Sequence, residues 1–161
     1  EDITINLLRH TSPLSVSKYL QVFQEYQKKQ KVWLENVLKM STSKWKIIFG
    51  HYPVFSNGPH QLSKRLQEFL VPLLMKYKVD FYISGHDHNL QHLTKNNTNY
   101  VIAGAFSSYS PRNPVMYEHL GSRFQASQGG YAKFKISLNE VRMQFIANNN
   151  KIIYDYLCSK L

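Results

Sequence analysis

Hydrophobic residues in the first half of the chain follow two kinds of pattern, a helical spacing and short continuous runs. Apolar side chains recur every three or four positions over Lys18–Met40 and again over Leu62–Tyr77, and this spacing predicts two amphipathic helices. Pro72 lies inside the second pattern, so we expect a kink or a break there. Short apolar runs at Lys46–Phe49 and Asp80–Ser84 lie on either side of the second helix. Strand, helix and strand in this order predict a parallel pair joined by a right-handed crossover.

The region before the first predicted helix is less regular. Ile3–Leu8 is a short apolar run that predicts a strand, and Arg9–Ser17 contains a proline and several hydroxyl residues, which favour a loop. Within the first helix the apolar positions form two stripes, which we expect to pack in a core rather than to bind a ligand. These stripes are Tyr19, Val22, Phe23 and Tyr26, followed by Trp33, Leu34, Val37 and Leu38.

The second half of the chain changes to the alternation typical of strands. Leu90–Leu93 and Tyr100–Ala103 predict two strands joined by a polar turn, and the long polar segment Ala105–Gln128 is interpreted as a loop. Three later runs alternate between apolar and polar residues and predict an antiparallel meander: Tyr131–Ile136, Val141–Ala147 and Ile152–Tyr156. The patterns together predict an α/β fold with mixed sheets, and no repeat or linker divides residues 1–161 into separate domains.

Each of the two predicted parallel strands ends in a glycine followed by histidine. Gly50-His51 follows the first strand, and Gly85-His86-Asp87-His88 follows the second. Ligands of open α/β sheets gather at the carboxyl ends of strands, and neutral imidazole suits zinc, iron and manganese. A single histidine is more often a packed structural residue. The spacing alone therefore leaves two interpretations open, a metal site and structural histidines.

Composition limits the classes of function. The 161 residues suffice for one domain, and no apolar run approaches the roughly 20 residues that a membrane span needs. The net charge of +10 favours an anionic partner such as a phosphate ester, a nucleic acid, an acidic protein or a membrane surface. The basic residues are scattered and no recognition motif accompanies them, so we do not expect nucleic-acid binding. A single cysteine, Cys158, excludes a disulfide within the chain.

Two motifs carry a resemblance to a known family. Gly50-His51-Tyr52-Pro53-Val54 and the stretch from Gly85 to Gln91, which reads Gly-His-Asp-His-Asn-Leu-Gln, resemble the C-terminal half of the purple acid phosphatases, within the calcineurin-like metallophosphoesterases. The tartrate-resistant type is the most similar. Further matching segments are Gln30-x-x-Trp33-Leu34, Tyr100–Ala105 and Gly129–Ala132. The resemblance runs from Lys18 to the C-terminus, and it implies the C-terminal half of a four-layer α/β/β/α sandwich with mixed sheets.

The resemblance also implies a set of metal ligands. His51 and His86 would bind a divalent ion, either Fe(II), Zn(II) or Mn(II), and His88 would bind Fe(III). Asp87 and Asn89 are expected to orient the metal-binding side chains and not to bind metal themselves. The remaining ligands of the family lie in an N-terminal half whose motifs this sequence does not contain. Three imidazoles cannot complete a two-metal site, so we expect this chain to be the C-terminal portion of a longer phosphatase, active only with that half.

The function implied by the resemblance is hydrolysis of phosphate monoesters by an acid phosphatase. His60, in the loop after the first histidine motif, is a candidate catalytic residue near the leaving group. The alternative is a phosphatase-like fold without turnover, kept as a binding or anchoring module. The family further implies a secretory, lysosomal, vacuolar or extracellular location, in which case the sequon at Asn96 would be a glycosylation site.

Overall fold

The structure is a computed structural model that describes residues 13–60, 64–109 and 121–160. Contacts divide the chain into two compact units, residues 1–41 and 42–161, which are described separately. The predicted strand at Ile3–Leu8 lies outside the described residues. No helix in the described ranges is both long enough and apolar enough to cross a membrane.

In the described residues of the first unit, the chain forms the long helix α2 (Pro13–Met40). It begins earlier than the apolar spacing predicts, so residues 13–17 are helical and their interpretation as a loop was wrong. Proline suits the first turn of a helix, because its fixed φ is already helical and its missing N–H would have no partner there. The stripes expected in a core are largely exposed in this chain: Tyr26 is 70% exposed and Trp33 60%, whereas Leu38 is buried. The expectation that these stripes pack in a core was therefore wrong for this chain.

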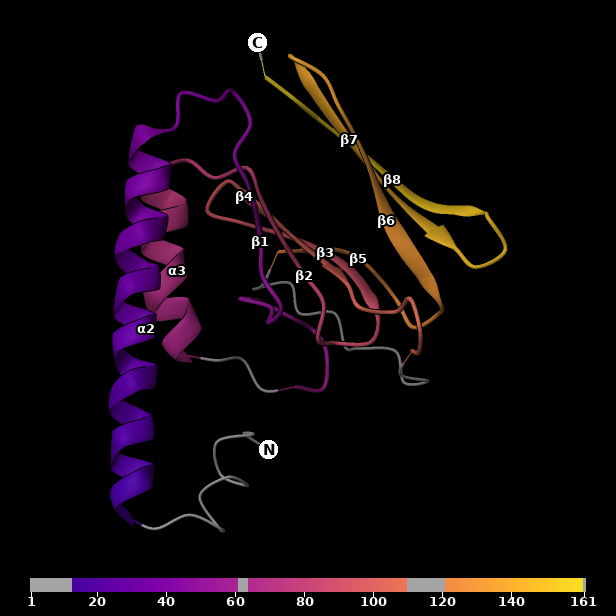
Figure 1. Cartoon of the computed structure of the whole chain (residues 1–161). Helices are drawn as coiled ribbons and strands as arrows, with labels where there is room; N and C mark the ends of the chain where they lie inside the picture. Colours follow the sequence, from indigo (N-terminus) through magenta and orange to yellow (C-terminus); the bar gives the residue numbers. More distant parts are fainter. Residues whose placement is uncertain (1–12, 61–63, 110–120, 161) are drawn as a thin grey trace. The chain divides into compact units, whose positions relative to one another are not determined.

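The second unit contains a five-stranded mixed sheet in the order β1-β2-β4-β3-β5 (Figure 1). The predicted parallel pair forms between β1 (Ile47–Phe49) and β2 (Phe81–Ser84), and β2 continues in parallel to β4 (Thr98–Ala103). Antiparallel pairing then joins β3 (Leu90–Lys95) to β4 and to β5 (Ser122–Ala126). Strand β5 lies inside the segment interpreted as a loop, which corrects that interpretation. The mixed α/β fold expected from the sequence is confirmed.

The crossover between the parallel strands is helix α3 (Lys64–Lys76). The helix continues through Pro72 to Lys76, so the proline does not break it. Burial of Leu70, Leu73 and Leu74 on one face stabilises it against the lost backbone hydrogen bond.

The remaining strands form the predicted antiparallel meander. Strand β6 (Gly130–Ile136) pairs with β7 (Glu140–Ala147), which pairs with β8 (Ile152–Ser159). Within this unit, α3 and the three-stranded sheet lie on opposite sides of the five-stranded sheet (Figure 1). Side chains of both sheets meet in one apolar cluster, which includes Phe81, Leu90, Val101, Val141, Met143 and Phe145. This core holds the carboxyl ends of β1, β2 and β4 at one edge of a rigid scaffold.

Near the opposite ends of β1 and β2, Lys160 ties the end of the chain to the five-stranded sheet. Its ammonium group lies 2.5 Å from a carboxylate oxygen of Asp80 and 4.5 Å from the ring centre of Trp45. The other Asp80 oxygen accepts a hydrogen bond from the backbone N–H of Lys46 at 2.8 Å. Asp80 therefore joins three segments that are distant in the sequence.

Candidate metal site

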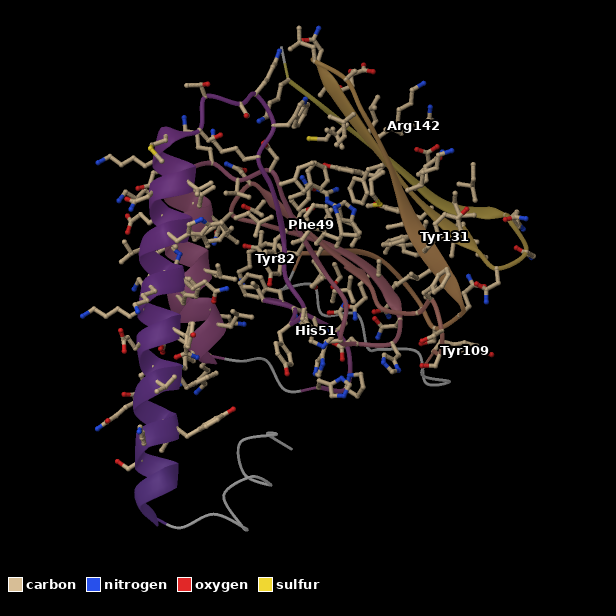
Figure 2. The ribbon with its side chains drawn as sticks, viewed as in Figure 1. Phe49, His51, Tyr82, Tyr109, Tyr131 and Arg142 are labelled. Atoms are coloured by element: carbon tan, nitrogen blue, oxygen red, sulfur yellow. The ribbon has the colours of Figure 1, made fainter. Side chains whose placement is uncertain are left out.

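The candidate site lies where the two Gly-His segments leave the parallel strands. The N–H of Gly50 donates to the carbonyl of Ile83 at 2.9 Å, and the N–H of Gly85 donates to the carbonyl of His51 at 3.1 Å. These bonds continue the β1–β2 pairing beyond the strand ends and fix the two segments against each other. Figure 2 shows His51 just beyond the end of β1.

A close approach explains the first glycine. A Cβ atom at Gly50 would lie 2.0 Å from the hydroxyl oxygen of Tyr82, which is buried and donates to the carbonyl of Tyr52 at 2.8 Å. A side chain at residue 50 would therefore displace the tyrosine that anchors the backbone next to His51. Residue 50 must therefore be glycine because no side chain fits there. In the turn after β2, by contrast, it is His86 that adopts a left-handed backbone conformation, with φ of 64°.

The structure brings two of the three predicted ligands together. The ring centres of His51 and His86 lie 5.3 Å apart, and Tyr52 and His60 lie 4.6 and 4.4 Å from His86. His88 is exposed and engages a different partner, because its Nδ1 lies 2.9 Å from the hydroxyl of Ser108, which follows β4. Among the described residues, no three His, Cys, Asp or Glu side chains gather closely enough to form a metal cluster.

The residue between the two histidines of the second motif points into the protein. Asp87 is fully buried, and its carboxylate accepts a hydrogen bond from the hydroxyl of Ser56 while its other oxygen faces Nδ1 of His60. Gly58 makes room for this arrangement, since a Cβ there would lie 2.3 Å from an oxygen of Asp87. Both carboxylate oxygens of Asp87 thus have partners in the loop after β1.

A second layer of buried polar groups supports Asp87. Gln91 donates to the side-chain oxygen of Asn89 at 2.7 Å and to the hydroxyl of Ser56 at 3.0 Å, and it accepts from the N–H of Asn57 at 2.8 Å. Residue-by-residue reasoning missed Ser56 and Gln91. The signal available for Gln91 was a polar residue within Leu90–Leu93, a run that predicts a strand, and the structure buries all four of these positions.

The electrostatic setting of His86 favours the form of imidazole that coordinates metals. Burial lowers the pKa of His86, and the nearby His60 lowers it further. A neutral ring at the end of a rigid strand, beside a second imidazole, fits a borderline transition ion such as iron, zinc or manganese. His51 and His86 would hold one such ion, and His88 would reach another only with ligands from outside the described residues.

Comparison with known sequences identifies the family. A sequence profile of the calcineurin-like phosphoesterases matches residues 4–90, more than half of the chain, and the chain belongs to that family. It is similar to human tartrate-resistant acid phosphatase type 5, with 34% identity over 131 residues that cover 76% of this chain and 40% of that protein. Purple acid phosphatase 17 of Arabidopsis thaliana is 31% identical over 79% of this chain and 39% of its own length. The resemblance to the C-terminal half of these enzymes is confirmed.

Solved structures agree on the fold. GAP50, the anchor in the inner membrane complex of Plasmodium, superposes with a TM-score of 0.75 at 24% identity, over 86% of this chain and 44% of that one. Purple acid phosphatase PPD1 from yellow lupin seeds gives a TM-score of 0.62 at 18% identity, over 81% of this chain and 28% of that one. The chain spans about two fifths of the length of the curated relatives it matches.

Proposed function

We propose that this chain supplies the histidine half of a two-metal centre in an acid phosphatase that hydrolyses phosphate monoesters. The observation that carries the proposal is the placement of His51 and His86 side by side at the ends of adjacent parallel strands, in a member of the calcineurin-like family. His51 and His86 hold a divalent ion, Fe(II), Zn(II) or Mn(II), and His88 holds Fe(III). The bound pair would lower the pKa of a water molecule and offset the negative charge that develops on the phosphoryl group.

His60 is the proposed proton donor to the leaving alcohol. Its Nδ1 faces the buried carboxylate of Asp87, which orients the ring and leaves Nε2 for the leaving group. The imidazole is half exposed and lies beside His86, so a substrate bound at the histidines could reach it. Asp87, itself held by Ser56, acts as the positioning residue, and Asn89 supports it through Gln91.

The proposal requires a partner segment, the N-terminal half of the same protein. The relatives are more than twice as long as the matched region, and three imidazoles leave each ion short of ligands. The carboxylates that bridge and complete the centre would come from that half. The proposed location is secretory, lysosomal, vacuolar or extracellular, as the family resemblance implies. There a glycan on Asn96 would project from the exposed turn between β3 and β4.

The test uses the full-length protein that contains this chain. Metal content by plasma emission, a visible spectrum and turnover of p-nitrophenyl phosphate are measured on one sample. We expect about two metals per molecule, with at least a hundredfold loss of turnover in His86→Ala and His88→Ala. Lys135→Ala, an exposed substitution on β6, serves as the control that keeps wild-type activity. Two bound metals with unchanged activity in both histidine variants would contradict the ligand assignment.

One observation favours a second candidate, a phosphatase-like fold that acts as a binding or anchoring module without turnover. The solved structure of GAP50, described as an anchor, shares this fold with a TM-score of 0.75. The same measurements separate the two candidates. A well-folded full-length protein without bound metal or turnover would favour the module, and retained metal with turnover would exclude it.

A further inference from the structure

Tyr52 lies beside both candidate ligands of the divalent ion, and the proposed function gives it no role. Its ring centre lies 4.8 Å from that of His51 and 4.6 Å from that of His86, and the two histidine ring centres lie 5.3 Å apart. The three rings therefore form a triangle in which each ring contacts the other two. Tyr52 meets His51 edge to face, at an interplanar angle of 81°, which is a favoured arrangement of two aromatic rings.

The separation of the two imidazoles matters because both must reach one ion. Zinc binds histidine nitrogen at about 2.0–2.1 Å, so two imidazoles at a tetrahedral angle have ring centres about 5 Å apart. The 5.3 Å between His51 and His86 agrees with that value. Functional side chains must be held to within about 0.5 Å of their working positions. A neighbour such as Tyr52, which contacts both rings, is therefore placed to control metal affinity.

The backbone of Tyr52 is itself fixed from two sides. The residue precedes Pro53, and a proline ring restricts the residue before it to extended conformations. The carbonyl of Tyr52 accepts a hydrogen bond of 2.8 Å from the hydroxyl of Tyr82, which is only 3% exposed. Burial raises the pKa of Tyr82 to about 12, so its hydroxyl stays protonated and remains a donor at physiological pH. Tyr82 on β2 thus holds the segment that carries His51 beyond β1.

We propose that Tyr52 is the positioning residue of the divalent-metal site, with its ring holding His51 and His86 at the spacing that one ion requires. The inference rests on the proposed function, because it takes these two histidines as ligands. Tyr82 acts through Tyr52, by holding its backbone in place. Tyr52 itself neither binds the ion nor transfers a proton. Its aromatic ring carries the role, so phenylalanine should replace it.

The first test measures the zinc affinity of the full-length protein by competition with a chelator, without any substrate. We expect Tyr52→Ala to bind zinc at least about tenfold more weakly, the usual effect of losing a residue that orients metal ligands. Tyr52→Phe keeps the ring and should stay within about threefold of the wild-type affinity. Wild-type affinity in Tyr52→Ala would overturn the proposal. A Tyr52→Phe variant as weak as Tyr52→Ala would overturn it too, because the hydroxyl would then carry the role.

A matched pair of buried tyrosines tests the role of Tyr82. Tyr82 and Tyr100 are direct neighbours on β2 and β4 and both are buried, but the hydroxyl of Tyr100 has no hydrogen-bond partner among the described residues. Tyr82→Phe should weaken zinc binding about fivefold, since the carbonyl of Tyr52 loses this donor. Tyr100→Phe should leave zinc affinity unchanged. Equal effects of the two substitutions would exclude a positioning role for Tyr82.

Nuclear magnetic resonance of the metal-free full-length protein keeps this inference separate from the proposed function. With isotope-labelled histidine, the ring C–H signals of His51 and His86 report the position of the Tyr52 ring through its ring current. Tyr82→Phe should shift both signals, although it removes no ring, and Tyr100→Phe should leave both in place. Unshifted signals in Tyr82→Phe would overturn the positioning of Tyr52 by Tyr82. A wild-type protein that binds no zinc would refute the metal site, and the same spectra would still decide whether Tyr82 fixes the rings.

Discussion

Acid should destabilise this protein through one buried histidine, His92 of β3. The side chain is fully buried, and its two ring nitrogens lie 2.9 Å from the hydroxyl of Tyr154 and 3.0 Å from the side-chain oxygen of Asn99. The amide nitrogen of Asn99 donates to the carbonyl of Asp80, so its oxygen is the group that accepts from His92. Nε2 therefore carries the proton and Nδ1 accepts from Tyr154, which is the neutral form of the ring.

The size of the effect follows from the pKa. Burial lowers the pKa of His92 from 6.5 to about 4, and the hydrogen bond to Asn99 opposes only part of that shift. Between these values the unfolded chain binds a proton that the folded chain does not. The free energy of unfolding thus falls as pH drops from about 6.5 towards 4. At about 1.4 kcal/mol per pKa unit the loss reaches about 3 kcal/mol.

The measurement is thermal unfolding of the metal-free full-length protein between pH 7 and pH 4. Because the full-length protein is more than twice as long as this chain, about 3 kcal/mol corresponds to about 4 °C in Tm, at about 2.1 cal/mol/K of unfolding entropy per residue. His92→Phe removes the titrating group, so its Tm should start lower at pH 7 but lose about 4 °C less on acidification. His51→Gln, which changes an exposed histidine, should keep the wild-type slope. If wild type and His92→Phe lose stability in parallel, His92 is not the source of the acid sensitivity.

Two further substitutions test the scaffold of the site. Gly50→Ala should lower the free energy of unfolding by about 1–3 kcal/mol, because its Cβ would overlap the hydroxyl of buried Tyr82. Gly85→Ala, whose Cβ would meet nothing closer than 3.9 Å, is the matched control, and equal Tm losses in the two would contradict the steric argument. Asp80→Asn should cost about 1–3 kcal/mol, since Lys160 and the N–H of Lys46 lose a charged acceptor. Lys160→Met should recover part of that loss in the double variant, and strict additivity of the two losses would argue against a direct pair.

Much of the fold could be predicted from the sequence because local pattern and burial agree. The runs that became β2 and β4 are largely apolar and buried, since these strands pair in parallel inside the sheet, whereas β1 is an apolar strand at the sheet edge that is only partly buried. Strand β5 was missed because its residues, Ser-Arg-Phe-Gln-Ala, are mostly polar and only partly buried. It is defined by its pairing with β3, which is a contact between distant segments that local periodicity does not encode.

The exposure of helix α2 shows another limit of pattern reasoning. Its stripes have the spacing of a buried face, and Tyr19, Phe23 and Trp33 are nevertheless 45–60% exposed. Periodicity shows that a helix has an apolar face, but it does not show what covers that face. The proposed N-terminal half would provide such a surface, and the stripes would then belong to a core that this chain shares with it.

Part of the candidate site could likewise be predicted from local sequence, whereas the rest depends on contacts between distant segments. The Gly-His motifs could be read from the sequence because both the glycine and the ligand belong to one short segment. The partners of Asp87 could not, because Ser56 and His60 come from the loop after β1 and reach Asp87 only when β1 and β2 pair. A buried carboxylate is costly unless it is hydrogen-bonded, so this loop must close for the second motif to hold its shape. The two histidine motifs therefore depend on each other. The buried residue between His86 and His88 couples the loop after the first strand to the ligands after the second.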